Sequence, residues 1–392
     1  MYIFRREFIL EGILYMINIE NKTDCTGCHA CANICPKNCI SMDRDIEGFR
    51  YPIINKSKCI ECNLCENVCP LIQEKKINNN PIAFACYNKD ELIRKKSSSG
   101  GIFSLLAQVV IENNGVVFGA KFDENFNVIH DYTLNIDEVA VFRGAKYVQS
   151  TIGNTYKDAK EFLDKGKIVL YSGTPCQISG LKRYLGKDYD SLFCVDLICH
   201  GVPSHKAWDK YKNYLNDGKQ IESISFRDKT YGWKSYSVKF KFKGGSEKLI
   251  KGSEDKYIRG FIGDIYLRPS CHDCKFKTLN RESDITLADF WGVNNVREEM
   301  DDDKGTSLIF VNSDRGSKLL EFISDNIVKK RVDINEAVKY NLSAIKSSYY
   351  NPRREYFFKN IDKFSFEKLV KKSLMDPLDI RIKTKILKIL KK

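Results

Sequence analysis

Two cysteine runs near the N-terminus have the residue types and the spacing of an iron–sulfur ligand set. Each run reads C-x2-C-x2-C-x3-C-P, and the two together comprise Cys25, Cys28, Cys31, Cys35, Cys59, Cys62, Cys65 and Cys69. In proteins with two 4Fe–4S clusters, three cysteines of such a run hold one cluster and the fourth reaches the other. We therefore expect one cluster on Cys25, Cys28, Cys31 and Cys69, and a second on Cys59, Cys62, Cys65 and Cys35.

Other uses of these cysteines are weaker interpretations. A disulfide framework requires an oxidising compartment, and the apolar stretch 8–17 is too short and too interrupted by Glu11 for an export signal. Structural zinc uses paired C-x2-C knuckles, which would leave half of these cysteines unexplained. A ninth cysteine, Cys39, breaks the spacing, and we interpret it as a packing residue beside a cluster.

Six further cysteines lie beyond the two runs. Cys176 begins an expected helix, whose N-terminal N–H groups stabilise a thiolate, and Cys199 ends the following strand. Cys271 and Cys274 form a C-x2-C knuckle. These four could converge on one metal centre, or the first two are ordinary buried cysteines and the knuckle binds zinc. The last two lie in expected strands and are assigned to the core: Cys86 and Cys194.

Strand and helix patterns alternate after residue 81. Short apolar runs predict strands, and apolar residues repeating every three or four positions predict helices. The expected strands cover 82–87, 115–120, 168–171 and 192–197, and the expected helices cover 102–112, 157–165, 178–185 and 206–215. Residues 235–242 and 246–250 alternate as a small inserted hairpin. The fold class is therefore α/β with a mixed or parallel sheet, behind a smaller α+β N-terminal module.

The length of 392 residues allows two or three domains. The polar residues Asn78 to Pro81 mark the expected linker. We predict an iron–sulfur domain over 16–77, an α/β domain over 81–375 and a basic helix over 376–392. We interpret residues 1–15 as a disordered extension or the product of an upstream start codon.

Charge and hydropathy exclude some classes of partner. The net charge of +13 lies mainly in the C-terminal portion, but no nucleic-acid-binding motif accompanies it, so we expect no nucleic-acid partner. No run reaches the roughly 18 apolar residues that a membrane span needs. Fifteen cysteines without an export signal predict the reducing cytoplasm.

The last thirteen residues have a helical amphipathic pattern. Ile382, Ile386 and Ile389 share one face, and basic side chains share another. Such a helix can rest on an anionic membrane surface. The commoner arrangement, a terminal helix packed on its domain with the basic face in solvent, is the favoured interpretation.

Six motifs beyond the linker resemble a known family when they are taken together and in order. They are SSSGG at 97–101, GAKYVQS at 144–150, GTPCQ at 173–177, CHG at 199–201, FRD at 226–228 and ADFWG at 288–292. The family is the beta subunit of hydrogenases and dehydrogenases that reduce a deazaflavin, coenzyme F-420. The N-terminal part resembles a bacterial two-cluster ferredoxin fused in front. Similar bacterial fusions often lie among surface-polysaccharide genes.

The resemblance implies a flavin, FAD, with a third 4Fe–4S cluster close to it. It implies a backbone cradle at Ser99, Gly100 and Gly101, because glycine allows close approach to a ring or phosphate. Alone, this segment would be interpreted as a turn before a helix. The isoalloxazine side would be lined by Lys146, Tyr147, Gln149 and Ser150, with the lysine stabilising the reduced anion.

The sequence thus predicts an iron–sulfur flavoprotein that exchanges electrons with a ferredoxin-like protein and reduces or oxidises a small organic substrate. The expected substrate residues are His200, Arg227, Asp228 and Trp233, because an Arg–Asp pair with an aromatic ring suits a polar, ring-bearing molecule. The alternative function is an electron-transfer subunit of a larger complex with no substrate of its own. A structural iron–sulfur protein without turnover is disfavoured by the flavin-type motifs.

Overall fold

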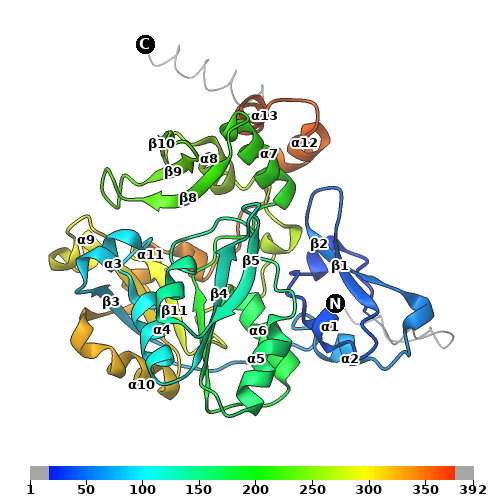
Figure 1. The fold of residues 1–392 in the computed structure, drawn as a ribbon, viewed down its shortest axis with the longest axis horizontal. Coiled ribbons are helices and arrows are strands. Elements are labelled where there is room, and N and C mark those ends of the chain that lie inside the picture. The colour runs from blue at the N-terminus through cyan, green and yellow to red at the C-terminus, as the bar shows by residue number, and fades with distance from the viewer. Residues whose placement is uncertain (1–16, 376–392) are drawn as a thin grey trace, which may run out of the picture.

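The computed structural model describes residues 17–375 and arranges them around one large sheet. A small N-terminal module packs on one side of this sheet, and a second, smaller sheet with its own helices lies across one end (Figure 1). The predicted extension 1–15 and the predicted basic helix 376–392, with its membrane interpretation, lie outside the described residues.

The N-terminal module consists of short elements around the cysteine runs. Its hairpin pairs β1 (Ile40–Arg44) with β2 (Arg50–Ile54) in antiparallel register. Two short helices each contain the third cysteine of a run, α1 (Ala30–Ile34) and α2 (Leu64–Asn67). The core of the module consists mostly of the cysteines themselves, with Ile17, Ile40 and Met42. A module with so few apolar side chains has little hydrophobic stabilisation of its own.

The large sheet has eight strands in the order β13-β3-β12-β11-β7-β6-β4-β5. Its centre is parallel, because β11, β7, β6 and β4 run in one direction, and the strands outside them pair antiparallel. The strands are β3 (Ile82–Asn88), β4 (Val116–Phe122), β5 (Val128–Thr133), β6 (Val169–Ser172), β7 (Leu192–Leu197), β11 (Ile285–Asp289), β12 (Ser307–Val311) and β13 (Ile327–Val332). The predicted α/β class with a mixed sheet is confirmed.

Helices cover both faces of the large sheet. One face packs against α4 (Ile102–Glu112) and α10 (Asp314–Phe322). The opposite face packs against α5 (Thr155–Asp164) and α6 (Pro175–Leu185) near β4, β6 and β7, and against α9 (Val293–Val296) and α11 (Ile334–Lys339) near β3 and β12. Successive strand residues alternate between these cores, which gives the three-layer arrangement of an α/β domain.

The smaller sheet contains one more strand than the hairpin that the sequence predicts. Its order is β10-β9-β8, formed by β8 (Ile221–Asp228), β9 (Ser237–Phe242) and β10 (Glu247–Lys251). Strand β8 lacks a clear apolar alternation because most of its first five side chains face solvent. An aromatic core joins this sheet to α7 (His205–Asn216), α8 (Lys256–Ile262), α12 (Arg354–Asn360) and α13 (Phe366–Ser373).

No helix among residues 17–375 combines the length and the apolar character needed to span a bilayer.

Buried polar contacts hold the N-terminal module against the rest of the chain. The Arg354 side chain, 5% exposed, donates to both carboxylate oxygens of Glu47, one of them at 2.9 Å, and to the Leu267 carbonyl at 2.8 Å. The His205 ring contacts the Gly48 carbonyl at 3.2 Å. These contacts fix the β1–β2 turn against α7 and α12.

We predict that Arg354→Met loosens this docking. The substitution leaves the Glu47 carboxylate without its bidentate partner, and breaking such a partly buried pair costs about 3 kcal/mol. The free energy of unfolding measured with a chemical denaturant should fall accordingly, and the β1–β2 turn should become a site of proteolysis.

Arg44→Met is the matched control. Its ion pair with Asp209 is 3.1 Å long and leaves both side chains about one-third exposed or more, so its loss should cost less than about 1 kcal/mol. Equal destabilisation by the two substitutions would contradict the docking role of Arg354.

Candidate functional site

The two cysteine runs adopt the same backbone conformation. Two and four residues after the first cysteine, each run has a positive φ: Gly27 at 70° and His29 at 66°, then Glu61 at 53° and Asn63 at 58°. In both runs the N–H group of the first of these residues donates to the sulfur of the first cysteine at 3.4 Å. Such N–H···S contacts are among the features that set the potentials of iron–sulfur clusters.

The structure brings together the crossed cysteine sets that the spacing predicts. Cys35 lines one cavity with Cys59, Cys62 and Cys65, which we call the outer cavity. In the other set, burial and then the neighbouring Cys69 and Cys25 raise the pKa of Cys28 to about 12. Cys39 is buried against the outer set, with its sulfur 3.3 Å from that of Cys35, which agrees with its predicted packing position.

The other four predicted ligands also meet in one place. Cys176 at the start of α6, Cys199 after β7, and the Cys271 and Cys274 knuckle all line a cavity that we call the four-cysteine cavity. Burial raises the pKa of each of these thiols, to about 12 for Cys271. A half-buried group of four thiols is a suitable donor set for a 4Fe–4S cluster, which binds them as thiolates.

Within residues 17–375, no three histidine, cysteine or acidic side chains approach one another as closely as the ligands of one metal ion must. The remaining two cysteines, Cys86 and Cys194, are fully buried in strands as predicted.

Helix α6 connects the first cysteine run to the four-cysteine cavity. Gly180 faces Cys28, because a Cβ atom at Gly180 would lie 3.0 Å from the Cys28 sulfur. Cys176 lies one helical turn earlier on the same helix, and positions four residues apart share a face at about 6 Å. Thr26, next to the first cysteine of its run, lines the four-cysteine cavity itself.

A cavity of about 350 Å³ lies at the carboxyl ends of the central strands. We call it the serine-loop cavity, because Ser97, Ser98, Ser99 and Gly101 form one of its walls. Residues 144–150 form another wall, and Gly173 and Thr174 lie at the end of β6. Carboxyl ends of parallel strands are where open α/β sheets bind their ligands.

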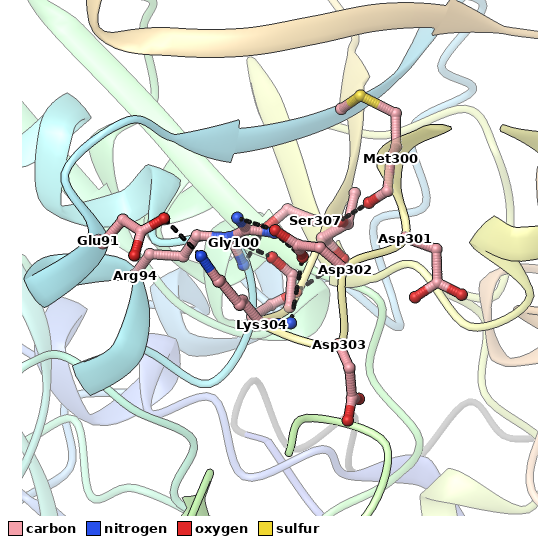
Figure 2. A network of polar contacts seen from close by, with 12 residues as sticks. Glu91, Arg94, Gly100, Met300, Asp301, Asp302, Asp303, Lys304 and Ser307 are labelled. Carbon is pink, nitrogen blue, oxygen red and sulfur yellow. Dashed lines mark hydrogen bonds and ion pairs between the residues drawn. The ribbon is translucent and has the colours of Figure 1, made fainter. Parts of the chain in front are cut away.

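The serine loop is held from behind by a polar network (Figure 2). Arg94, 2% exposed, donates to both carboxylate oxygens of Asp302 at 2.6 and 2.8 Å. Lys304 pairs with Glu91, and the Gly100 N–H donates to the Ser307 hydroxyl at 2.9 Å. The loop backbone is therefore fixed by side chains from the segment 300–307.

Lys229, which directly follows β8 of the smaller sheet, also binds the serine loop. Its ammonium donates to the carbonyls of Arg94, Ser99 and Lys304 at 2.7–2.8 Å. Burial lowers the pKa of Lys229 to about 7. Sequence reasoning missed this residue, because a lysine that binds only backbone carbonyls has no motif.

Lys146 reaches three backbone carbonyls next to the serine-loop cavity. Its Nζ atom lies 3.1–3.3 Å from the carbonyl oxygens of Phe142, Arg143 and Gly144. Burial lowers the pKa of Lys146 to about 7, so its charge changes near neutral pH. Tyr147 lines the cavity beside it.

Two predicted flavin residues, Gln149 and Ser150, line the serine-loop cavity and also contact other segments, whereas Gly100 does not line it. The Gln149 side chain donates to the Thr26 carbonyl of the N-terminal module at 2.9 Å, and Ser150 accepts from Gln177 at 2.9 Å. Gly100 is buried behind the wall, where a Cβ atom would lie 2.5 Å from the Cys86 carbonyl oxygen. Position 100 therefore excludes a side chain because the backbone packs closely against β3.

His130 on β5 is a cavity residue that sequence reasoning missed. Its Nε2 atom lies 2.9 Å from the Ser172 carbonyl, which can only accept, so Nε2 carries the proton. Its Nδ1 atom is buried and has no partner among the described residues. Burial lowers the pKa of His130 to about 4, which leaves a neutral ring with one free acceptor at this cavity.

A further cavity, of about 530 Å³, adjoins the four-cysteine cavity and the serine-loop cavity. We call it the arginine cavity after Arg227, which is 5% exposed and donates to Asp289 at 2.8 Å and to the Tyr147 hydroxyl at 3.3 Å. The guanidinium carbon lies 4.0 Å from the ring centre of Tyr236 and 5.0 Å from that of Trp291. The Nε and Nη2 groups of Arg227 are buried and have no hydrogen-bond partner within residues 17–375.

The predicted pairing around Arg227 is wrong in two details. Its acidic partner is Asp289, whereas Asp228 accepts from the Thr230 N–H at 2.9 Å and caps its own turn. Adjacent strand residues face opposite sides, which separates Arg227 from Asp228. Trp233 is buried behind Trp291, which lines the cavity in its place.

His200 separates the four-cysteine cavity from the arginine cavity and lines both. Its Nε2 atom lies 2.7 Å from a carboxylate oxygen of Asp264. Asp264 has a positive φ of 59°, a conformation uncommon for aspartate, and is buried. The pair fixes the orientation of the imidazole ring beside Cys199.

Comparisons with known proteins agree with these features. Residues 24–71 match the family described as 4Fe-4S dicluster domain. Residues 166–337 match the family described as the C terminus of the beta subunit of Coenzyme F420 hydrogenase/dehydrogenase. No curated protein matches the chain.

Among solved structures, the chain is similar to a chain of the F420-reducing [NiFe] hydrogenase complex from Methanosarcina barkeri, studied by xenon derivatization. The identity is 16% and the TM-score 0.46, over 70% of this chain and 97% of that chain.

The sequence resemblance is thus confirmed, and iron–sulfur electron transfer follows from it as the general chemistry of the protein. Residues 166–337 are thus similar to the C-terminal part of coenzyme F420 hydrogenase/dehydrogenase beta subunits, and residues 24–71, which precede them, are similar to 4Fe–4S dicluster domains.

Proposed function

We propose that the protein is an iron–sulfur flavoprotein that transfers electrons between a ferredoxin-like partner and a small organic substrate. The observation that carries this proposal is the continuity of the cavities. Cys199 and His200 line both the four-cysteine and the arginine cavity, and Lys146 and Tyr147 line both the arginine and the serine-loop cavity. A redox centre, a cofactor and a substrate would therefore be neighbours.

Iron–sulfur clusters and a flavin would supply complementary chemistry in these cavities. Clusters exchange single electrons, and a flavin couples single-electron steps to two-electron reactions. The crossed sets of the two runs would hold two clusters, and Cys176, Cys199, Cys271 and Cys274 would hold a third. The cysteines also exclude water, since every sulfur ligand except that of the exposed Cys62 is buried or half-buried.

The serine-loop cavity would hold the flavin. Helix α4 begins at its wall with Gly101 as the N-cap, at a φ of 82° and with no side chain capping the first N–H groups. Free N–H groups at a helix N-terminus favour a phosphate. The free Nδ1 of His130 could accept a hydrogen bond from a ring N–H, and Lys146 would place a positive charge beside an anionic ring.

The arginine cavity would hold the substrate. Arg227 presents a cation between the rings of Tyr236 and Trp291, which suits a planar, polar molecule. This cavity favours an enzyme over the alternative, an electron-transfer subunit, because such a subunit has no use for a built substrate site. The deazaflavin coenzyme is one candidate substrate, and the association with polysaccharide synthesis stays a prediction.

Iron content tests the cluster assignment. Anaerobically purified protein should contain about twelve irons per chain, from three clusters of four. Iron and acid-labile sulfide would be measured together with zinc. A content near eight irons with one equivalent of zinc would assign the knuckle of Cys271 and Cys274 to zinc.

Crossed ligation predicts that substituting Cys35 damages a cluster, whereas substituting the neighbouring Cys39 does not. Cys35→Ser should damage the cluster of the second run, measured as loss of one EPR signal from the reduced protein. Cys39→Ser is the matched control, because its sulfur lies beside that of Cys35 but belongs to neither run. If Cys35→Ser removed the cluster of Cys25, Cys28 and Cys31 instead, the crossed assignment would be wrong.

The flavin site predicts a pH dependence that rests on Lys146. Its lowered pKa of about 7 means that the ammonium is charged below this pH and neutral above it. Retention of reduced, anionic flavin should therefore weaken as the pH rises through about 7. The Lys146→Met variant should retain the flavin weakly at every pH and show no such pH dependence.

Flavin retention would be measured anaerobically by fluorescence after denaturation. The control is Lys165→Met, which removes an exposed lysine at the end of α5, away from the cavity. Protein that holds its iron but binds no FAD after reconstitution supports the electron-transfer subunit instead.

A further inference from the structure

Arg268 carries a positive charge that the protein buries without a neutralising acid. The side chain is 0% exposed, and its three hydrogen bonds go to neutral groups: the Cys25 carbonyl at 2.7 Å, the Arg50 carbonyl at 2.9 Å and the Gln149 side chain at 3.2 Å. None of the ion pairs formed within residues 17–375 includes Arg268.

A buried cation of this kind requires an anion nearby. Removing a guanidinium from water costs several kcal/mol even after relaxation, and neutral carbonyls compensate only in part. Two acids of the N-terminal module are already paired, Asp45 with Lys22 and Glu47 with Arg354. The carbonyl that Arg268 holds most closely belongs to Cys25, in the loop that would hold, together with Cys69, a cluster of net negative charge.

Lys277 repeats this arrangement at the four-cysteine cavity. It lines the cavity, and its ammonium donates to the carbonyls of Cys199, Ser343 and His200. None of the ion pairs in the described part of the chain includes Lys277. Arg281 lines the same cavity but is already paired with Asp196 at 3.3 Å.

The outer cavity has no equivalent buried cation among the described residues that line it. Its one basic lining residue, Lys37, is exposed, as are the nearby Lys56 and Lys58. Water and salt screen an exposed charge, so its effect on a neighbouring cluster is small. Cys62 in this set is itself exposed.

We call the clusters proposed for the first cysteine run and for the four-cysteine cavity the inner clusters, and the one proposed for the outer cavity the outer cluster. We propose that Arg268 and Lys277 are the counter-cations of the two inner clusters and raise their reduction potentials above that of the outer cluster. The proposal rests on the proposed function, because it requires clusters at all three cysteine sets. An added electron increases the negative charge of a cluster, and a fixed cation nearby stabilises the reduced form.

The consequence is a direction for electron transfer. A one-electron iron–sulfur donor would be oxidised by giving up one electron, and the outer cluster would be reduced by accepting it. Passing it inward re-oxidises the outer cluster and reduces an inner one, with no proton or bond change at the cysteines. The charges of Arg268 and Lys277 make that exchange favourable towards the arginine cavity and unfavourable in reverse.

Redox titration of the holoprotein, followed by EPR, tests this proposal. Lys277→Met should lower the midpoint potential of one cluster signal, and Arg268→Met should lower that of a different one. Lys58→Met, beside the exposed outer set, is the matched control and should shift no signal comparably. Arg268→Lys keeps the positive charge but loses the three hydrogen bonds of the guanidinium. The midpoint potential of the affected cluster should therefore stay nearer to the wild-type value than in Arg268→Met.

The outcomes separate this proposal from the proposed function. If Arg268→Met fails to fold, Lys277→Met and Arg268→Lys still carry the test. The counter-cation proposal would be overturned, and the proposed function left standing, by either of two results obtained with all three clusters intact. In the first, Lys277→Met and Arg268→Met change no potential. In the second, Lys58→Met changes a potential as much as they do. Protein in which the inner cysteine sets bind no cluster would instead overturn the proposed function.

Discussion

The contact between Cys28 and Gly180 is the constraint on which the arrangement of the cysteine sets depends. A side chain at Gly180 would lie 3.0 Å from both the Cβ and the sulfur of Cys28, so the first cysteine loop can approach α6 this closely only because the residue is glycine. The same helix begins with Cys176. One turn of helix therefore separates the N-terminal module from the four-cysteine cavity, and the contacts of Arg354 and Arg268 hold the module at that distance.

Polar side chains, more than apolar packing, shape the site. The serine loop is fixed by Arg94 and Lys229, and the module is fixed by Arg268 and Arg354. Each of these cations binds backbone carbonyls, which sets backbone position directly. Buried charges used in this way are costly unless they are paired, and two of these cations, Arg94 and Arg354, also bind acids.

The sequence predicted the parts of the fold that depend on local patterns. The cysteine runs, the α/β alternation and the four helices α4 to α7 follow from spacing and periodicity, and the predicted bounds of these helices agree with the structure to within a few residues. Strands β5, β8, β11, β12 and β13 and the helices α3 and α8 to α13 were not predicted. In β8, the exposed side chains remove the apolar alternation. Asp289, His130 and Lys229 were missed because their roles arise from contacts between distant segments, and no spacing in the sequence records such contacts.

Clusters held by the first cysteine run and by the four-cysteine cavity would be neighbours across one turn of α6. EPR of the fully reduced holoprotein tests this proximity, because two paramagnetic clusters about one helical turn apart broaden and split each other's signals. We expect an interacting spectrum that simplifies when Cys199→Ala removes the cluster of the four-cysteine cavity. A wild-type spectrum equal to the sum of isolated clusters would contradict the arrangement.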